Sequence, residues 1–143
     1  ARFQVLPGQP VTILDAAHNP HAARVLAQNL NQMGYAPYTH AVFGAMADKD
    51  VLGVMKIMLP HIDHWHLCSL PIERAATSTQ LHDTLMDAGF AVDEHHSVMQ
   101  HESVAKALTH LATTAAANDR IAVFGSFVTI EQALLGNIQS SKG

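Results

Sequence analysis

The chain alternates apolar, strand-like runs with stretches of helical periodicity, and this alternation is what most constrains its fold. The runs VTIL (residues 11–14) and IAVF (residues 121–124) are continuously apolar, which is typical of strands buried on both faces. Between them, apolar residues recur at spacings of three and four, as on the buried face of a helix. We expect strands over residues 2–6, 11–15, 38–46, 63–70, 90–95 and 120–127, and helices over residues 20–34, 51–60, 77–88, 102–117 and 129–138.

Repeated strand–helix units predict parallel strands that are joined by right-handed crossovers. We therefore expect an α/β fold, a Rossmann-like three-layer sandwich with a mostly parallel sheet of about five or six strands and helices on both faces. The turn sequence PGQP (residues 7–10) separates the first two strand-like runs. Residues 2–6 therefore form either a hairpin with the next strand or a linker that leads into it.

Length and composition narrow the class of protein. With 143 residues, of which 48% are hydrophobic, the chain suits one domain with a core of its own. The formal net charge is −4 and no stretch concentrates Lys or Arg, so we expect no nucleic-acid partner. No apolar run approaches the about 20 residues of a membrane span, so we expect no membrane partner either. The single cysteine, Cys68, fits a reducing compartment, and we expect a cytoplasmic protein.

In a parallel sheet, ligands bind beyond the carboxyl ends of the strands, and three polar clusters follow predicted strands. Asp15 can accept hydrogen bonds from sugar hydroxyls or cap the following helix. His18 lies just before a helix N-terminus, where the helix dipole favours a neutral imidazole or a nearby anion. Lys49 can meet an anion or remain a solvated surface residue, and Ser126 can face the cleft or act as a helix cap. All of these residues are predicted to lie at one edge of the sheet.

The sequence also lacks two nucleotide-binding motifs. Neither G-x-x-x-x-G-K-[ST] nor G-x-G-x-x-G is present, so the chain has no phosphate loop or dinucleotide fingerprint of its own. A domain of this kind can handle a nucleotide only together with another element.

Eleven histidines raise the alternative of a metal-binding module. Zinc requires about four converging ligands, and there is no second cysteine. His64 and His66 share one face of an extended strand, whereas His61 points elsewhere unless the strand begins after it. We interpret residues 63–70 as a surface strand rich in polar residues and expect no metal site. A receiver-like signalling module is the other alternative, but Asp15 has no acidic neighbour at the end of its strand.

Five segments together resemble a known family. They are RFQ (2–4), DAAHNPHAA (15–23), VFGAMADKD (42–50), ERAAT (73–77) and VFGSFVTI (123–130). In this order and spacing they are similar to the C-terminal domain of the folylpolyglutamate synthase and dihydrofolate synthase branch of the Mur ligase family. The resemblance spans nearly the whole chain, and D-x-A-H-N-P is its most specific element. Ala16 stands where glycine or another small residue is common in the family.

The resemblance implies an ATP-dependent ligase that adds glutamate to folates or to dihydropteroate through an acyl phosphate. It implies that Arg2 and Asp15 bind ATP, at the phosphates and the ribose respectively. His18 would then be catalytic, and Lys49 and Ser126 would bind the incoming glutamate. The alternative within the family is another Mur-type amino-acid ligase.

The resemblance also implies a division into domains. Residues 1–10 would be an interdomain linker or strand, and residues 11–143 the C-terminal glutamate ligase domain. The N-terminal ATPase domain, which would carry the phosphate loop and most Mg²⁺ ligands, is absent from this sequence. ATP, glutamate, a folate or dihydropteroate and that ATPase domain are the implied partners, and we expect the 143-residue chain to be inactive in isolation.

Overall fold

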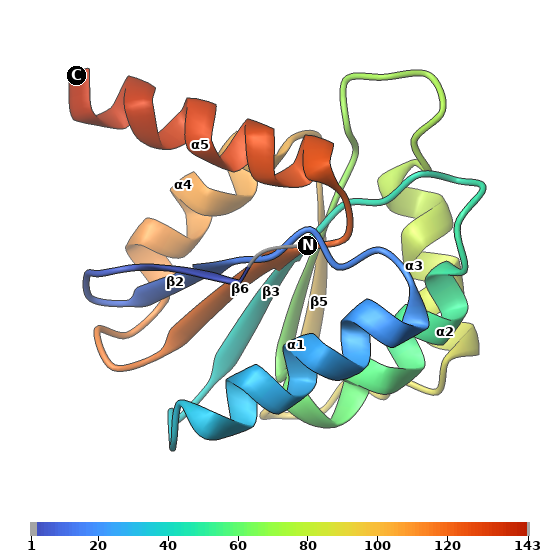
Figure 1. The fold of residues 1–143 in the computed structure, drawn as a ribbon, viewed down its shortest axis with the longest axis horizontal. Coiled ribbons are helices and arrows are strands. Elements are labelled where there is room, and N and C mark those ends of the chain that lie inside the picture. Colours follow the sequence, from blue (N-terminus) through green and yellow to red (C-terminus); the bar gives the residue numbers. More distant parts are fainter. Residues whose placement is uncertain (1–2, 143) are drawn as a thin grey trace.

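The computed structural model of the protein describes residues 3–142, with side chains described through residue 136. Its strands are β1 (Gln4–Leu6), β2 (Val11–Leu14), β3 (Thr39–Phe43), β4 (His64–Cys68), β5 (Ser97–His101) and β6 (Arg120–Phe124). Its helices are α1 (Pro20–Gln32), α2 (Val51–Met58), the short 3-10 helix η1 (Leu59–His61), α3 (Ser78–Asp87), α4 (Val104–Thr114) and α5 (Phe127–Lys142). Strands and helices therefore alternate as the sequence predicts (Figure 1).

The six strands form one sheet in the order β1-β2-β6-β3-β4-β5. Strands β2, β6, β3, β4 and β5 pair in parallel, and β1 pairs with β2 in antiparallel register. The predicted α/β fold with a mostly parallel sheet is confirmed. The first two strands form the hairpin alternative, with Val5 opposite Ile13.

Helices cover both faces of the sheet. α1, α2 and α3 pack on one face, whereas α4 and α5 pack together on the other (Figure 1). Alternate residues of each strand enter the two cores: Phe43 and Phe124 pack on the α1 side, and Val42 and Val123 on the α4 side. This period of two explains why the run IAVF (residues 121–124) in the central strand β6 is apolar at every position.

The structure corrects the prediction of a strand over residues 90–95. Residues 93–96 form a turn closed by an isolated bridge between Asp93 and His96, and the strand is instead β5, Ser97–His101. β5 is an edge strand, and only Val98 and Met99 in it are apolar. An edge strand buries little apolar surface, so its sequence carries a weak hydrophobic pattern.

The interpretation of residues 63–70 as a surface strand is wrong. β4 lies inside the sheet between β3 and β5, and its residues Trp65 and His66 are buried. His66 is therefore packed against neighbouring side chains, whereas His64 is half-buried. His61 lies before this strand, in η1, as the spacing allows.

The strand order brings three loops to one edge of the sheet. β6 lies between β2 and β3, so the residues after these three strands are neighbours at the carboxyl edge. They are residues 15–19, 44–50 and 125–126. Within residues 3–142, none of the helices combines the length and apolar character that a membrane crossing requires.

Candidate functional site

Asp15 directly follows β2 and is held there by the backbone. Its N–H donates to the carbonyl of Val123 on β6, and its Oδ1 accepts from the N–H of Ala17 at 2.9 Å. The residue is only 5% exposed, and burial raises the pKa of its carboxyl group despite the Ala17 hydrogen bond. The other oxygen, Oδ2, accepts no hydrogen bond from any described residue, so it is free to accept one from a ligand.

The structure rules out one of the two roles considered for Asp15, that of a helix cap. Asn19 is the N-cap of α1, because its Oδ1 accepts from the N–H of Ala22 at 2.8 Å, and Pro20 occupies the first helical position. Asp15 therefore does not cap the helix. The cap signal was present in the sequence, since asparagine before a proline is a common helix start.

His18 is half-buried and has one fixed ring nitrogen. Its Nδ1 lies 2.9 Å from the carbonyl oxygen of Ala16, and because a carbonyl only accepts, Nδ1 carries the proton of the neutral ring. Nε2 then presents a lone pair and has no partner among the described residues. The ring also lies beside Phe127, with ring centroids 6.1 Å apart and an interplanar angle of 49°.

Ser126 belongs to a buried hydrogen-bond network at the start of α5. Its Oγ accepts from the N–H of Thr129 at 3.0 Å and lies 2.7 Å from Thr129 Oγ1. Thr129 Oγ1 donates its only proton to the carbonyl of Gly44 at 2.7 Å, so Ser126 must donate its own proton to Thr129. The Ser126 hydroxyl therefore caps the helix. In this orientation it can only accept a hydrogen bond from a ligand, and it must rotate in order to donate one.

Thr129 is a residue that the sequence analysis missed. It is fully buried, and it links the end of β3 to the beginning of α5 through Gly44. Its signal was the spacing of Ser126 and Thr129, three residues apart at a helix start, which is typical of a side-chain cap.

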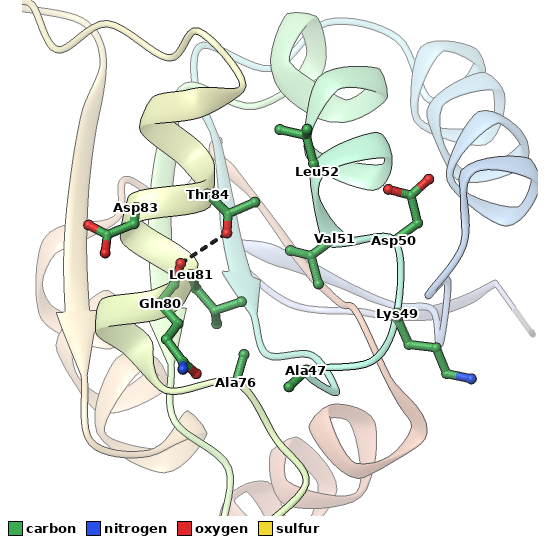
Figure 2. A pocket seen from close by; sticks show the side chains of 10 residues that line it. All are labelled: Ala47, Lys49, Asp50, Val51, Leu52, Ala76, Gln80, Leu81, Asp83 and Thr84. Carbon is green, nitrogen blue, oxygen red and sulfur yellow. Dashed lines mark hydrogen bonds between the residues drawn. The ribbon is translucent and has the colours of Figure 1, made fainter.

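Lys49 lies in the turn between β3 and α2, at the same edge of the sheet. Its side chain is exposed and forms no ion pair with another described residue. The neighbouring Asp50 caps α2 by accepting from the N–H of Gly53 at 2.9 Å. Lys49 lies at the rim of a cavity of about 440 Å³ between α2 and α3, and Figure 2 shows its ammonium group directed away from that cavity.

The loop that carries Lys49 is braced by the segment of residues 73–77. The N–H of Ala47 donates to the carbonyl of Arg74, and the N–H of Ala76 donates to the carbonyl of Ala45, both at 2.9 Å. The structure thus places Asp15 and His18 after β2, Ser126 after β6 and Lys49 after β3, at one edge of the sheet. Arg2 lies outside the described residues.

Several histidines lie side by side in the structure. Within the described part of the chain, no group of three or more His, Cys, Asp or Glu side chains is arranged to hold a metal ion. His66 lies 2.9 Å from His101, from Nδ1 to Nε2, and His40 pairs with the buried Asp119 at 2.9 Å.

A family model for the glutamate ligase domain of Mur ligases matches residues 1–127 of the chain. The chain belongs to the Mur ligase family. This glutamate ligase domain is similar to part of the dihydrofolate synthase/folylpolyglutamate synthase of Escherichia coli strain K12, with 32% identity over 133 residues. The match covers 93% of the domain and 29% of that protein, so the chain spans under a third of the length of this relative.

Solved structures give the same result for the fold. E. coli FolC in complex with ADP, without folate substrate, superposes with a TM-score of 0.87 and 30% identity over 99% of the chain and 32% of FolC. A bifunctional folylpolyglutamate synthase/dihydrofolate synthase with Mn, AMPPNP and L-glutamate bound gives 0.77 and 31%, over 99% of the chain and 31% of that enzyme. The glutamate ligase domain therefore has the fold of one part of these enzymes. Membership in this family also removes the receiver-like alternative.

Proposed function

We propose that the chain acts as the C-terminal domain of an ATP-dependent ligase that adds glutamate to folates, to dihydropteroate or to both. One observation carries the proposal: the buried Asp15, with a free carboxylate oxygen, and His18, with a free Nε2, lie at the strand ends of a Mur ligase glutamate ligase domain. Similar enzymes bind an ATP analogue, Mn and L-glutamate, which supports a nucleotide, a divalent ion and an amino acid as its ligands. Addition of a different amino acid, as in other Mur-type ligases, is the alternative.

In this proposal the domain contributes half of a divided site. Asp15 Oδ2 accepts hydrogen bonds from the ribose hydroxyls of ATP, and Arg2 contacts the phosphates. Lys49 and Ser126 bind the carboxylates of the incoming glutamate, and Ser126 must rotate its hydroxyl away from Thr129 to donate to one of them. Residues 1–10 would connect to an N-terminal ATPase domain, and residues 11–143 would form the glutamate ligase domain.

The reaction would proceed in two steps, formation of an acyl phosphate and then of an amide. A substrate carboxylate attacks the γ-phosphate of ATP, which gives an acyl phosphate and releases ADP. The amino group of glutamate then attacks the acyl carbon, the amide bond forms and phosphate leaves. Closure of the two domains would exclude water from the acyl phosphate, and we place this chemistry in the cytoplasm.

His18 has the protonation pattern of a proton acceptor for the second step. Its Nδ1 proton is held by Ala16, so Nε2 can take a proton from the ammonium group of glutamate and leave a nucleophilic amine. Mg²⁺ would neutralise phosphate charge when bound. We expect its ligands to lie mainly on the ATPase domain.

The experiment joins this chain to the N-terminal part of the E. coli relative and measures glutamate addition. We expect the purified chain alone to show no ATP hydrolysis and no ligation, and the joined enzyme to be active. Asp15→Ala in the joined enzyme should weaken ATP binding about tenfold or more, because a hydrogen bond to a charged group is lost. Asp15→Asn keeps an acceptor for Ala17 and separates loss of charge from local disruption. Turnover by the chain alone, or unchanged ATP affinity in Asp15→Ala, would contradict the proposal.

Ser126→Ala tests the glutamate site. We expect a higher glutamate KM with little change in the KM for ATP, together with a loss of about 1 kcal/mol of stability because α5 loses its cap. Urea denaturation measures the stability, and initial rates at varied glutamate measure the KM. An unchanged glutamate KM would leave Ser126 as a helix cap only.

A further inference from the structure

Phe127 is an aromatic residue at the site that the proposed reaction leaves without a role. It is the first residue of α5, directly after Ser126, and its side chain is 66% exposed. Its ring lies beside that of His18, at a centroid distance of 6.1 Å. A phenyl ring that is two-thirds exposed contributes little to the core, so its position beside His18 is its most informative property.

His18 needs a second constraint in addition to its hydrogen bond. The bond from Nδ1 to Ala16 fixes one atom of the imidazole, but a single hydrogen bond at a half-exposed site competes with water. Without a neighbour on its face, the ring can rotate, exchange its proton to Nε2 and lose the free lone pair there. The Phe127 ring lies beside the imidazole, within the range of aromatic pairs, where it can restrict this rotation.

Phe127 is itself held by rigid structure. The network of Ser126, Thr129 and the carbonyl of Gly44 fixes the first turn of α5 against the end of β3. The side chains of Ser126 and Thr129 are both buried. The ring therefore projects from a fixed helix start rather than from a mobile loop.

We propose that Phe127 is a positioning residue for His18: its ring packs against the imidazole and keeps the proton on Nδ1 and the lone pair on Nε2. The catalytic consequence of this arrangement rests on the proposed ligase function. The arrangement itself is a property of the 143-residue chain and can be measured without any enzymatic assay.

The first test measures the ring nitrogens of His18 by ¹⁵N NMR in the purified chain. In the unchanged chain we expect the Nδ1-protonated tautomer. Phe127→Ala should shift the signals toward the Nε2-protonated form, whereas Phe127→Leu, which keeps an apolar side chain, should largely retain the original pattern. Tyr35→Ala is the matched control, because Tyr35 is 91% exposed and follows α1 at the other end of that helix from His18.

The second test measures turnover in the joined enzyme. Phe127→Ala should lower kcat about tenfold with little change in the KM for ATP, and Phe127→Leu should restore most of the rate. In a His18→Ala background, Phe127→Ala should have no further effect, because the two residues act as one unit.

The outcomes separate the two proposals. Unchanged His18 signals in Phe127→Ala, with the fold intact by circular dichroism, would overturn the positioning role. Independent, multiplicative effects of the His18 and Phe127 substitutions on kcat would also overturn it. A shifted tautomer together with an inactive joined enzyme would support the positioning role and count against the ligase function.

Discussion

Replacing Gly125 by alanine is expected to destabilise the protein by about 3 kcal/mol or more, the largest effect of a single methyl group that the structure predicts. Gly125 follows β6 with φ of +117°, a conformation that residues with a Cβ rarely adopt. A Cβ at this position would lie 2.2 Å from the carbonyl oxygen of Gly44 and 2.9 Å from the ring of Phe43. Neither obstacle is a flexible side-chain end, so the ends of β3 and β6 would have to separate.

Gly89→Ala provides the matched control for this substitution. Gly89 also has a positive φ, +101°, but a Cβ there would have no heavy atom within 4 Å. The control therefore carries only the conformational cost, about 1 kcal/mol. The free energies of unfolding of both variants, measured by urea denaturation, give the cost of the clash as their difference. Equal losses would contradict the close approach of the two strand ends.

The close approach at Gly125 also has a functional consequence. The same Gly44 carbonyl accepts the hydrogen bond of Thr129, which orients Ser126 and the start of α5. A displacement of Gly44 would therefore move Phe127 and, through it, His18. Stability and site geometry depend on one contact between two strand ends.

Local sequence signals were sufficient to locate the helices and strands that bury apolar surface. Continuous apolar runs located β2 and β6, and Pro20 and Gly34 delimited α1. The edge strand β5 was not predicted, because half-exposed strands lack a hydrophobic pattern. The prediction fell instead on the neighbouring residues 90–95, which contain the apolar Phe90 and Val92. Periodicity thus reports burial, and it fails where an element is held mainly by backbone pairing.

The site was predictable to the level of which strand ends meet. Asp15, His18 and Ser126 could be located because parallel strands place their carboxyl ends at one edge. The direction of each hydroxyl and imidazole proton could not, since it depends on partners distant in sequence, such as Gly44 for Thr129. The same limit applies to the histidines: only the strand order shows that His40, His66 and His101 lie on neighbouring strands.

The buried histidine cluster predicts a loss of stability in mild acid. His66 on β4 is 4% exposed, and burial, followed by the nearby imidazoles, lowers its pKa from 6.5 to about 3. These imidazoles come from β4 itself, from both neighbouring strands and from one helix: His64 on β4, His40 on β3, His101 on β5 and His110 on α4. Burial also lowers the pKa values of His64 and His101.

The sign of the effect follows from proton uptake on unfolding. Below pH 6.5 the unfolded chain binds a proton at His66 that the folded protein does not bind. The contribution of neutral His66 to the free energy of unfolding is therefore complete above pH 6.5 and decreases as the pH falls to about 3. At pH 5 the contribution of His66 alone is a loss of about 2 kcal/mol. We expect urea denaturation to show at least this difference between pH 7.5 and pH 5.

His66→Gln tests the assignment of this loss to His66. Glutamine keeps hydrogen-bonding groups that can face His101 but does not titrate, so the difference between the two pH values should shrink by about 2 kcal/mol. His21→Gln is the control, since His21 is exposed on α1 and outside the cluster, and its pH dependence should match that of the unchanged protein. Equal stability of the unchanged protein at both pH values would show that His66 is solvated. An undiminished loss in His66→Gln would assign the acid sensitivity to the other histidines of the cluster.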